Sequence, residues 1–542
     1  MVLDKLLEIT MKIALTHGKI YIEANHFEEA LLIENGLITF VGKNNEVSLM
    51  IDENTQHINL KGKTLVPGFN DSHLHFYNTA NVHNWIHLDG LDSIDAMITH
   101  IKETYSKQVG PVIYGMGWNQ ENFVNDKMRF PNRHDLDRIN CGKPLVLYRM
   151  DGHMIVCNTI ALNLMMDISR APLINGGEIL LDDEGSALGI LSEKALDLLT
   201  KLPQEYDSEL ILNHIESLIK VAHRQGITSI QVNDLMINGE PNLIENAYLK
   251  YAKDKPQIRV THQICFKDLD SFKQRIASKY VIQNDAFLKY GSLKLFADGT
   301  LGARTAALLE LYDDDPTNRG ILTLNEEELT EWIYTAHQNK ISVVIHVIGD
   351  RALDLVLHIF ESLNDSLNTL RHGLIHLQIT NDELLQRIRD LNLVAYIQPI
   401  FLHHDLHILE KRIGKKRASR SYAFKTLIRS GCISPFSSDS PIESFNVFEN
   451  IHCAVLRQDL NGSPKEGFYP EECVSISEAV DAYTIAGAYA SHEEHYKGRI
   501  KPNYLADLVL LNQDIFTIDA HMIKDTEVEM TFVQGELVYQ KI

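Results

Sequence analysis

Leu65-Val66-Pro67-Gly68-Phe69-Asn70-Asp71-Ser72-His73-Leu74-His75-Phe76 is an apolar run that ends in two histidines two residues apart. Side chains alternate between the faces of a strand, so His73 and His75 share one face and Leu74 points to the other. Neutral imidazole binds zinc and other first-row metals, so this pair can begin a metal site. Alone, however, an H-x-H pair more often means two partly buried histidines. Residues elsewhere in the chain must distinguish a metal site from this structural alternative.

Length and charge narrow the class of protein. The 542 residues exceed a single ordinary core and predict a large domain with a smaller one, or a barrel with insertions. The formal net charge of −22 argues against nucleic acid or an anionic membrane as a partner, and favours a small neutral or cationic substrate. Small-molecule enzymes are often homodimers, so a homodimer is an expectation if the protein is one.

Cysteine usage and hydropathy indicate the compartment. The six cysteines include no C-x-x-C pair, so they predict neither a disulfide framework nor a cysteine zinc site. No stretch approaches eighteen uninterrupted apolar residues, and the first residues lack a basic region followed by an apolar one. We therefore expect a cytoplasmic protein with reduced thiols.

The middle of the chain alternates β runs with helical stretches, which predicts an α/β fold with a parallel sheet. Candidate strands lie at 64–69, 227–231, 257–263, 292–297, 342–347, 373–377, 393–398 and 432–437. Eight such strands predict a (β/α)8 barrel of the TIM type. In that fold the catalytic groups lie at the carboxyl ends of the strands.

The two ends of the chain read differently, as short alternating strands broken by turn residues. Neither end has enough strands for its own core, so we expect residues 1–66 and 495–542 to pair into one small β-sandwich. The barrel domain would then span 67–494. Residues 77–225 are too many for a βα loop, and predict a folded insertion over the mouth of the barrel.

Polar residues follow the predicted barrel strands. They are His73 and His75 after the first strand, Lys294 in the fourth with Asp298 beyond it, His346 at the fifth, His376 at the sixth and Asp439 after the eighth. Alternation directs Lys294 into the barrel, where an unpaired ammonium is costly. It either becomes an anionic carbamate that bridges two metals, or pairs with Asp298 or Asp439.

These residues predict metal-dependent hydrolysis. A divalent metal lowers the pKa of its water towards 7 and polarises a carbonyl, while a carboxylate such as Asp439 can bind the metal and shuttle a proton. Helix N-capping is the structural alternative for Asp439. No serine nucleophile motif, P-loop or dinucleotide fingerprint competes with this interpretation.

With these residues in place, the chain resembles the amidohydrolase superfamily, and within it amidohydrolase family 3, the group that includes N-substituted formamide deformylase. The resemblance runs over nearly the whole length. Its motifs are 66–69 with the H-x-H pair, 115–118, 151–153, 177–189, 226–229, 294–299, 301–306, 346–352, 371–376, 438–441, 497–498 and 506–509.

The resemblance implies hydrolysis of a carbon–nitrogen bond other than a peptide bond. It implies metal ligands at His73, His75, carbamylated Lys294, His346, His376 and Asp439, with one or two divalent ions and zinc as the first candidate. The glycine-flanked Trp118 and His153 of the insertion, together with Asp298 and Arg304, are the expected substrate-binding residues.

Departures from the family pattern affect the substrate more than the metal. Ile375 stands where a glutamate is more frequent, Asn119 where an aspartate is usual, and Ser438 replaces a common glycine. The metal set is intact, but one member's substrate does not transfer to this chain. A deaminase or a lactonase or esterase on the same metal site stays open, and so does a non-catalytic binding protein that retains the barrel.

Overall fold

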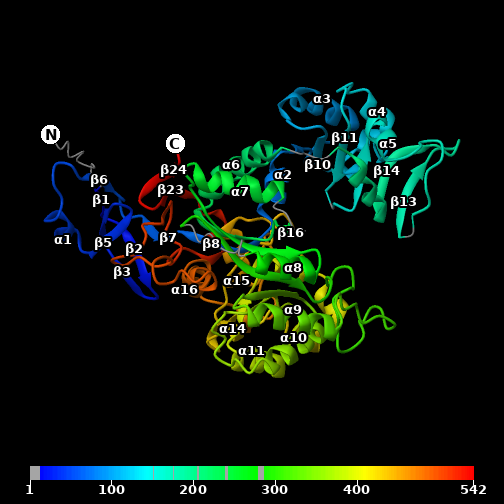
Figure 1. Cartoon of the computed structure of the whole chain (residues 1–542). Helices are drawn as coiled ribbons and strands as arrows, with labels where there is room; N and C mark the ends of the chain where they lie inside the picture. Colours follow the sequence, from blue (N-terminus) through cyan, green and yellow to red (C-terminus); the bar gives the residue numbers. More distant parts are fainter. Residues whose placement is uncertain (1–11, 151, 175, 204–206, 238–241, 279–285) are drawn as a thin grey trace. The chain divides into compact units, whose positions relative to one another are not determined.

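The computed structural model describes residues 12–150, 152–174, 176–203, 207–237, 242–278 and 286–542 (Figure 1). The chain forms two compact units. One comprises the described residues of Met1–Phe76 and Ile219–Ile542, and the other those of Tyr77–Leu218. The second unit thus ends within helix α6 (Ser208–Arg224), and the rest of that helix leads into a strand of the first.

The first unit is built around a parallel sheet whose neighbours follow the order of the chain. Its strands are β8 (Phe69–Leu74), β15 (Ile227–Val232), β17 (Arg259–Phe266), β18 (Leu288–Phe296), β19 (Val343–Val347), β20 (Gly373–His376) and β21 (Val394–Tyr396), with β16 (Met236–Ile237) beside β17. Every described residue of β8 and β15 is buried, as expected for strands covered on both faces.

The segment after β21 brings the two edges of this sheet together. Ala395 N–H donates to the carbonyl of Ile433 at 2.9 Å, and Ile397 N–H to that of Pro435 at 3.1 Å. On the other side, Ser72 N–H of β8 donates to the carbonyl of Phe436 at 3.2 Å. The result is a mixed α/β fold with a nearly closed barrel of parallel strands.

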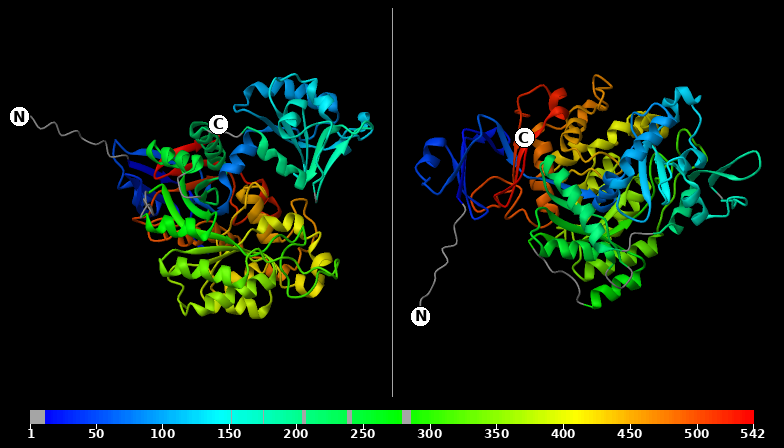
Figure 2. Two further views of the ribbon diagram at one scale, coloured as in Figure 1. Left: turned by 45° about the vertical axis from the view of Figure 1, so that its right-hand side comes forward. Right: turned by 90° about the horizontal axis from the view of Figure 1, so that it is seen from above.

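Helices follow the strands and lie outside them (Figures 1 and 2). They are α7 (Leu243–Lys253), α8 (Leu269–Ala277), α9 (Glu326–Gln338), α10 (Asp350–Ser362), α11 (Asp382–Asp390), α13 (Leu409–Ala418), α14 (Phe424–Arg429), α15 (Val447–Leu456), α16 (Ile476–Tyr483) and α17 (Ile485–Ala490). The start of helix α9 is fixed by its sequence. Asn325 caps the first turn by accepting from Glu328 N–H, and Glu328 completes a capping box.

The two ends of the chain form two further sheets, of which the first contains N-terminal strands and the second contains strands from both ends. One has the order β5 (Leu37–Gly42), β4 (Ala30–Glu34), β1 (Lys12–Thr16) and β6 (Gln56–Asn59). The other has the order β24 (Glu536–Gln540), β23 (Val528–Val533), β22 (Leu508–Leu511), β7 (Thr64–Pro67), β2 (Lys19–Glu23) and β3 (His26–Glu28). Leu15, Leu31, Leu65 and Leu508 belong to one buried cluster, so the two sheets share a core.

The second unit has its own mixed sheet. The order is β13 (Gly177–Leu181), β14 (Ala187–Glu193), β12 (Met154–Cys157), β11 (Leu145–Arg149), β10 (Ile113–Trp118) and β9 (Ile86–His87). Alternation along β11 sends Leu145 and Leu147 into the cluster under α3 (Ile94–Thr104), and Val146 into the cluster under α5 (Thr159–Met165). Both faces of this sheet are therefore covered.

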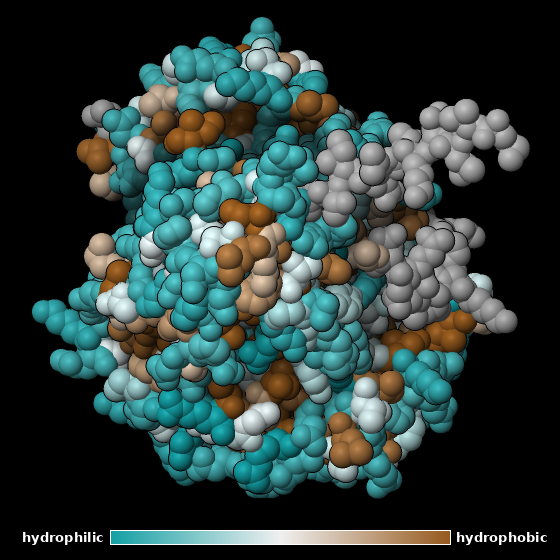
Figure 3. Space-filling view, turned by 90° about the vertical axis from the view of Figure 1, so that its left-hand side faces the viewer, coloured by the Kyte–Doolittle hydropathy of each residue, from teal (hydrophilic) through white to brown (hydrophobic). Residues whose placement is uncertain are grey.

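The surface fits the acidic, polar composition. On the face shown in Figure 3, hydrophilic residues predominate and hydrophobic ones form small scattered groups. All six cysteines are free. Among the described residues, no helix combines the length and the apolar character needed to cross a membrane.

A buried ion pair joins the barrel to the terminal strands. Arg259 of β17 donates from Nε to Oδ2 of Asp507 at 3.0 Å, and both side chains are almost fully buried. We expect Asp507→Ala to lower the free energy of unfolding by about 3–5 kcal/mol, because it leaves a buried guanidinium without its partner. Urea unfolding followed by circular dichroism measures this change.

The exposed ion pair of Lys273 with Glu331 supplies the control. Lys273→Ala should leave the unfolding midpoint unchanged, since exposed pairs contribute little. The double variant Arg259→Met with Asp507→Leu should recover most of the stability that Asp507→Ala loses. An Asp507→Ala protein as stable as the parent would contradict a structural role for this pair.

His262 makes stability depend on pH. Its ring packs between Tyr248 and Tyr290, and neither ring nitrogen has a hydrogen-bond partner among the described residues. Burial lowers its pKa to about 3. The folded protein keeps this ring neutral while the unfolded chain protonates it below about pH 6.5, so its contribution to stability falls as pH drops from 6.5 towards 3.

We expect His262→Phe to flatten the pH dependence of unfolding below pH 6.5, by about 1.4 kcal/mol per pH unit. Urea unfolding at pH 7, 6 and 5 measures the slope. His358→Gln, which removes an exposed imidazole from α10, is the matched control. Equal slopes in the parent and His262→Phe would show that this ring is not the buried neutral group described above.

Candidate metal centre

The predicted metal ligands come together at the carboxyl ends of neighbouring strands. His73 lies in β8 with His75 just beyond it, Lys294 lies in β18, and His346 and His376 lie in β19 and β20. Asp439 follows the segment that bridges β21 and β8. All of these side chains except His75 belong to buried residues, and His75 is only partly exposed.

The geometry leaves a space that a cation fits. Ligand atoms of His73, His376 and Asp439 lie within 4.8 Å of one another. The Nε2 atoms of His73 and His75 lie 3.5 and 3.4 Å from Oδ1 of Asp439. That carboxylate oxygen is buried and has no hydrogen-bond partner among the described residues. Imidazole and carboxylate donors around an unpaired buried oxygen suit a divalent metal.

Hydrogen bonds from outside the cluster orient each ring. Nδ1 of His73 donates to Oε1 of Gln263 at 2.6 Å, and Nδ1 of His376 to Oε1 of Gln398 at 2.9 Å. His75 Nδ1 bonds the carbonyl of Asn233 at 2.9 Å, and His346 Nε2 that of Gly299 at 3.1 Å. With one nitrogen held in this way, the other is available to a metal.

Burial controls the charge of the imidazoles. It lowers the pKa of His346 to about 3, with a further contribution from Lys294. The pKa values of His73 and His376 fall well below their ordinary value for the same reason, again with Lys294 adding to the effect. For His75, burial opposes ionisation, but the nearby carboxylate of Asp439 outweighs it and raises the pKa. Three rings are thus neutral, as metal binding requires.

Lys294 is fully buried, and burial lowers its pKa to about 8. Its Nζ lies 4.1 Å from the centre of the Phe296 ring and 3.4 Å from the carbonyl of Leu295. Among the described residues, no carboxylate lies within ion-pairing distance of this amine, so the predicted alternative of a pair with Asp298 or Asp439 is not seen. Carbamylation stays a prediction.

Asp71 is a residue of the site that sequence reasoning missed. It is buried, and its carboxylate accepts from the N–H and Oγ–H of Ser438 at 3.1 and 2.5 Å. Burial raises its pKa to about 7. Asp439 has φ +56°, a strained region for a residue other than glycine, and Asp71 holds its neighbour in place. The available signal was Asp71 two residues before His73, on the same strand face.

The predicted substrate residues of the first unit make structural contacts. Asp298 is buried and accepts backbone N–H groups from Ala307, Ile348 and Gly349 at 2.9, 3.0 and 2.7 Å. Burial raises its pKa to about 7. Asp298 therefore fastens the following loop to the end of β19, where its Oδ1 lies 3.7 Å from Nε2 of His346.

The other predicted substrate residues also have protein partners. Arg304 donates to both carboxylate oxygens of Asp314 at 3.0 Å. In the second unit, Trp118 is fully buried and donates from its indole to the carbonyl of Leu147, whereas the His153 side chain is 72% exposed. Asp151 lies outside the described residues. Substrate contact stays a prediction for all four residues.

A groove of about 410 Å³ borders Lys294. Phe266, Leu269, Phe296, Leu324 and Trp332 supply apolar surface, and charged residues such as Lys267 and Glu331 also line it. Phe296 lies 5.5 Å from the ring of His346, centre to centre. The groove therefore provides an apolar space next to the metal centre within the first unit.

Comparison with known proteins agrees with this geometry. Residues 56–539 match the Amidohydrolase family. The chain is 31% identical to YtcJ of Bacillus subtilis (strain 168), over 97% of this chain and 99% of that protein. It is 25% identical to N-substituted formamide deformylase of Arthrobacter pascens, over 95% and 96%. A solved structure of an uncharacterized metal-dependent hydrolase from Pyrococcus furiosus superposes with a TM-score of 0.78 at 28% identity, covering 93% of this chain and all of that one. The chain therefore belongs to amidohydrolase family 3, within the superfamily of metal-dependent hydrolases.

Proposed function

We propose that this protein hydrolyses a carbon–nitrogen amide bond, other than a peptide bond, in a small molecule. The observation that carries the proposal is the cluster of buried neutral imidazoles around the unpaired Oδ1 of Asp439. Membership of the amidohydrolase family supports it, and so does the similarity to a deformylase that acts on N-substituted formamides. We further propose that the barrel of this chain is a (β/α)8 barrel, with 432–437 as its eighth strand, and that both chain ends form a β-sandwich beside it.

The chain offers a ligand set for one or two divalent ions, with zinc as the first candidate. The ligands are His73, His75, His346, His376 and Asp439, joined by Lys294 if it is carbamylated. When bound, the metal supplies a Lewis acid that polarises the substrate carbonyl and lowers the pKa of water. The rings need no deprotonation beforehand, because burial already keeps three of them neutral.

Asp439 moves the proton in this proposal. Its Oδ1 has no competing hydrogen bond among the described residues, and it lies close to two ligand imidazoles. It accepts a proton from the attacking water and then donates it to the leaving nitrogen. Asp71 and Ser438 keep the carboxylate aimed at the centre, and the apolar groove beside Lys294 excludes water from the substituent of the amide.

Lys294 fits a carbamate because its pKa of about 8 leaves part of the amine neutral near neutral pH. The neutral Nζ attacks the carbon of carbon dioxide: an N–C bond forms, one C=O π bond breaks with its electron pair going to oxygen, and the nitrogen loses one proton to solvent. The product is an anionic group with two oxygens, able to bridge two metals. It also replaces a buried amine that has no carboxylate partner among the described residues.

Metal content tests the ligand set. We expect about two metal equivalents per chain in protein reconstituted with bicarbonate, fewer without it, and about one in Lys294→Ala, because the carbamate is the bridging ligand. Elemental analysis by inductively coupled plasma mass spectrometry gives the count. Lys273→Ala, which removes an exposed lysine, should match the parent. One equivalent regardless of Lys294 would exclude the bridged pair and leave a single-metal site.

Activity tests the reaction class. We expect Asp439→Asn to lower kcat by about 10²–10⁴-fold on N-substituted formamides, acylamines or cyclic amides, since the general acid–base is lost. Asp390→Asn, on the exposed side of α11, should leave kcat unchanged. Product analysis separates the alternatives. Amide hydrolysis converts a formamide or acylamine into an acid and an amine, and a cyclic amide into a ring-opened amino acid. A deaminase would release ammonia, and an esterase would release an acid and an alcohol. Absence of turnover in all of these classes would favour a binding protein.

A further inference from the structure

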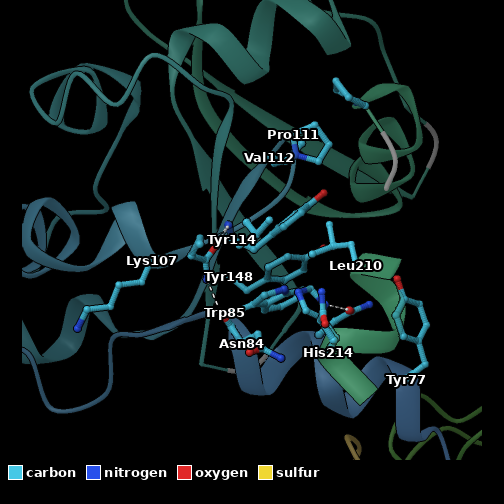
Figure 4. Close-up of a pocket in the computed structure, with 15 residues that line it drawn as sticks. Tyr77, Asn84, Trp85, Lys107, Pro111, Val112, Tyr114, Tyr148, Leu210 and His214 are labelled. Carbon is cyan, nitrogen blue, oxygen red and sulfur yellow. Dashed lines mark hydrogen bonds between the residues drawn. The ribbon is translucent and has the colours of Figure 1, made fainter. Parts of the chain in front are cut away.

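A second cavity lies wholly within the unit Tyr77–Leu218, and none of its lining residues belongs to the metal centre (Figure 4). Its volume is about 420 Å³. Helix α2 (Phe76–Asn84), strands β10 and β11 and the start of α6 contribute its walls. Small-molecule sites fall between about 300 and 1,000 Å³, so this cavity is large enough for one ring system.

Three aromatic side chains form one wall. Trp85 stacks on Tyr114 with ring centres 5.2 Å apart and on Tyr148 at 5.1 Å, with interplanar angles of 22° and 15°. Met116 pairs with Tyr148 across β10 and β11, and Tyr114 lies two residues before Met116, so the two tyrosines share a face of the sheet. Tyr114 and Tyr148 are held on adjacent strands, and Trp85 follows helix α2; the nearly parallel rings suit the stacking of a planar ring.

Two hydrogen-bond donors of this wall lack a partner in the described part of the chain. Neither the indole N–H of Trp85 nor the hydroxyl of Tyr148 is hydrogen-bonded to another described residue, although both side chains are partly buried and line the cavity. Burial raises the pKa of Tyr148 to about 12, so its hydroxyl keeps its proton at neutral pH. Partly buried donors of this kind usually find an acceptor.

The polar side chains around the wall are held in place. His214 Nδ1 bonds Oδ1 of Asn81 at 2.9 Å, and Oε1 of Gln108 accepts from the N–H of Tyr114 at 3.0 Å. Burial lowers the pKa of His214, which favours its neutral form. Lys107 is the one Lys, Arg, Asp or Glu among the described lining residues, and Figure 4 shows its side chain directed away from the rings. An uncharged ligand therefore matches the cavity better than an ion.

We propose that this cavity binds an uncharged aromatic ring bearing a carbonyl group, such as an aromatic carboxamide. The ring stacks on the wall of Trp85, Tyr114 and Tyr148, and the carbonyl oxygen accepts from the indole or the hydroxyl. The site is separate from the metal centre in its residues, and its occupation does not depend on the proposed hydrolysis.

Binding of benzamide to the metal-loaded protein tests the proposal, with cyclohexanecarboxamide as the matched probe that keeps the amide but lacks the flat ring. Isothermal titration calorimetry measures both, and NMR checks that benzamide is intact afterwards. We expect a dissociation constant of about 1 mM or tighter for benzamide and at least tenfold weaker binding of the saturated analogue.

Variants place the ligand in this cavity. We expect Trp85→Leu to weaken benzamide binding about tenfold, since it loses ring stacking and one donor. Tyr148→Phe, which keeps the ring and removes only the hydroxyl, should weaken binding about threefold to tenfold. Trp332→Leu alters the groove beside Lys294 and should have no effect. Circular dichroism verifies that each variant is folded.

Two results would overturn the proposal. One is equal binding of benzamide and cyclohexanecarboxamide, or no binding of either. The other is benzamide affinity that depends on Trp332 but is indifferent to both Trp85 and Tyr148, which would place the ring in the groove of the first unit.

Discussion

Burial of ionisable groups without enough protein partners is the constraint on which this structure depends. The barrel encloses several imidazoles, an amine and a carboxylate, and desolvation, helped by the charge of Lys294, keeps His73, His346 and His376 uncharged. What remains is one buried oxygen of Asp439 that has no hydrogen-bond partner among the described residues. A cation would satisfy that oxygen and accept the neutral imidazoles as ligands, so the same burial accounts for the energetics of the interior and for the chemistry of the site.

The strands place these groups, and a shell of polar residues keeps them aimed. Gln263 lies within β17 and Gln398 just beyond β21; both are buried, and each accepts a ring N–H. Asp71 ties the strand of His73 to the segment of Asp439. Removing any of these contacts would leave the ligands present but free to rotate, which is why such residues matter nearly as much as the ligands.

Local patterns predicted the middle barrel strands well, because alternation and apolar runs are local properties. The expected first barrel strand at 64–69 was wrong: β7 pairs with β2 and β22 in another sheet, and the barrel strand is β8. The family and the parallel α/β sheet are confirmed. Ligand atoms of His73, His376 and Asp439 lie within 4.8 Å of one another, and their role as metal ligands stays a prediction. The bond of Asp71 to Ser438 joins residues far apart in the chain, and no periodicity reveals it. Burial of Trp118 was also hidden, since a glycine-flanked tryptophan looks the same in a core as in a pocket.

The pairing of β7 has a consequence for the order in which the chain can assemble. Strand β7 leads directly to the strand of His73, and one of its neighbours is β22, with Leu508 opposite Pro67 and Val509 opposite Val66. During synthesis β7 therefore emerges from the ribosome long before β22 has been made. Until the ribosome has released Leu508–Leu511, β7 presents an open edge, and the nascent chain is exposed to mispairing for most of its translation.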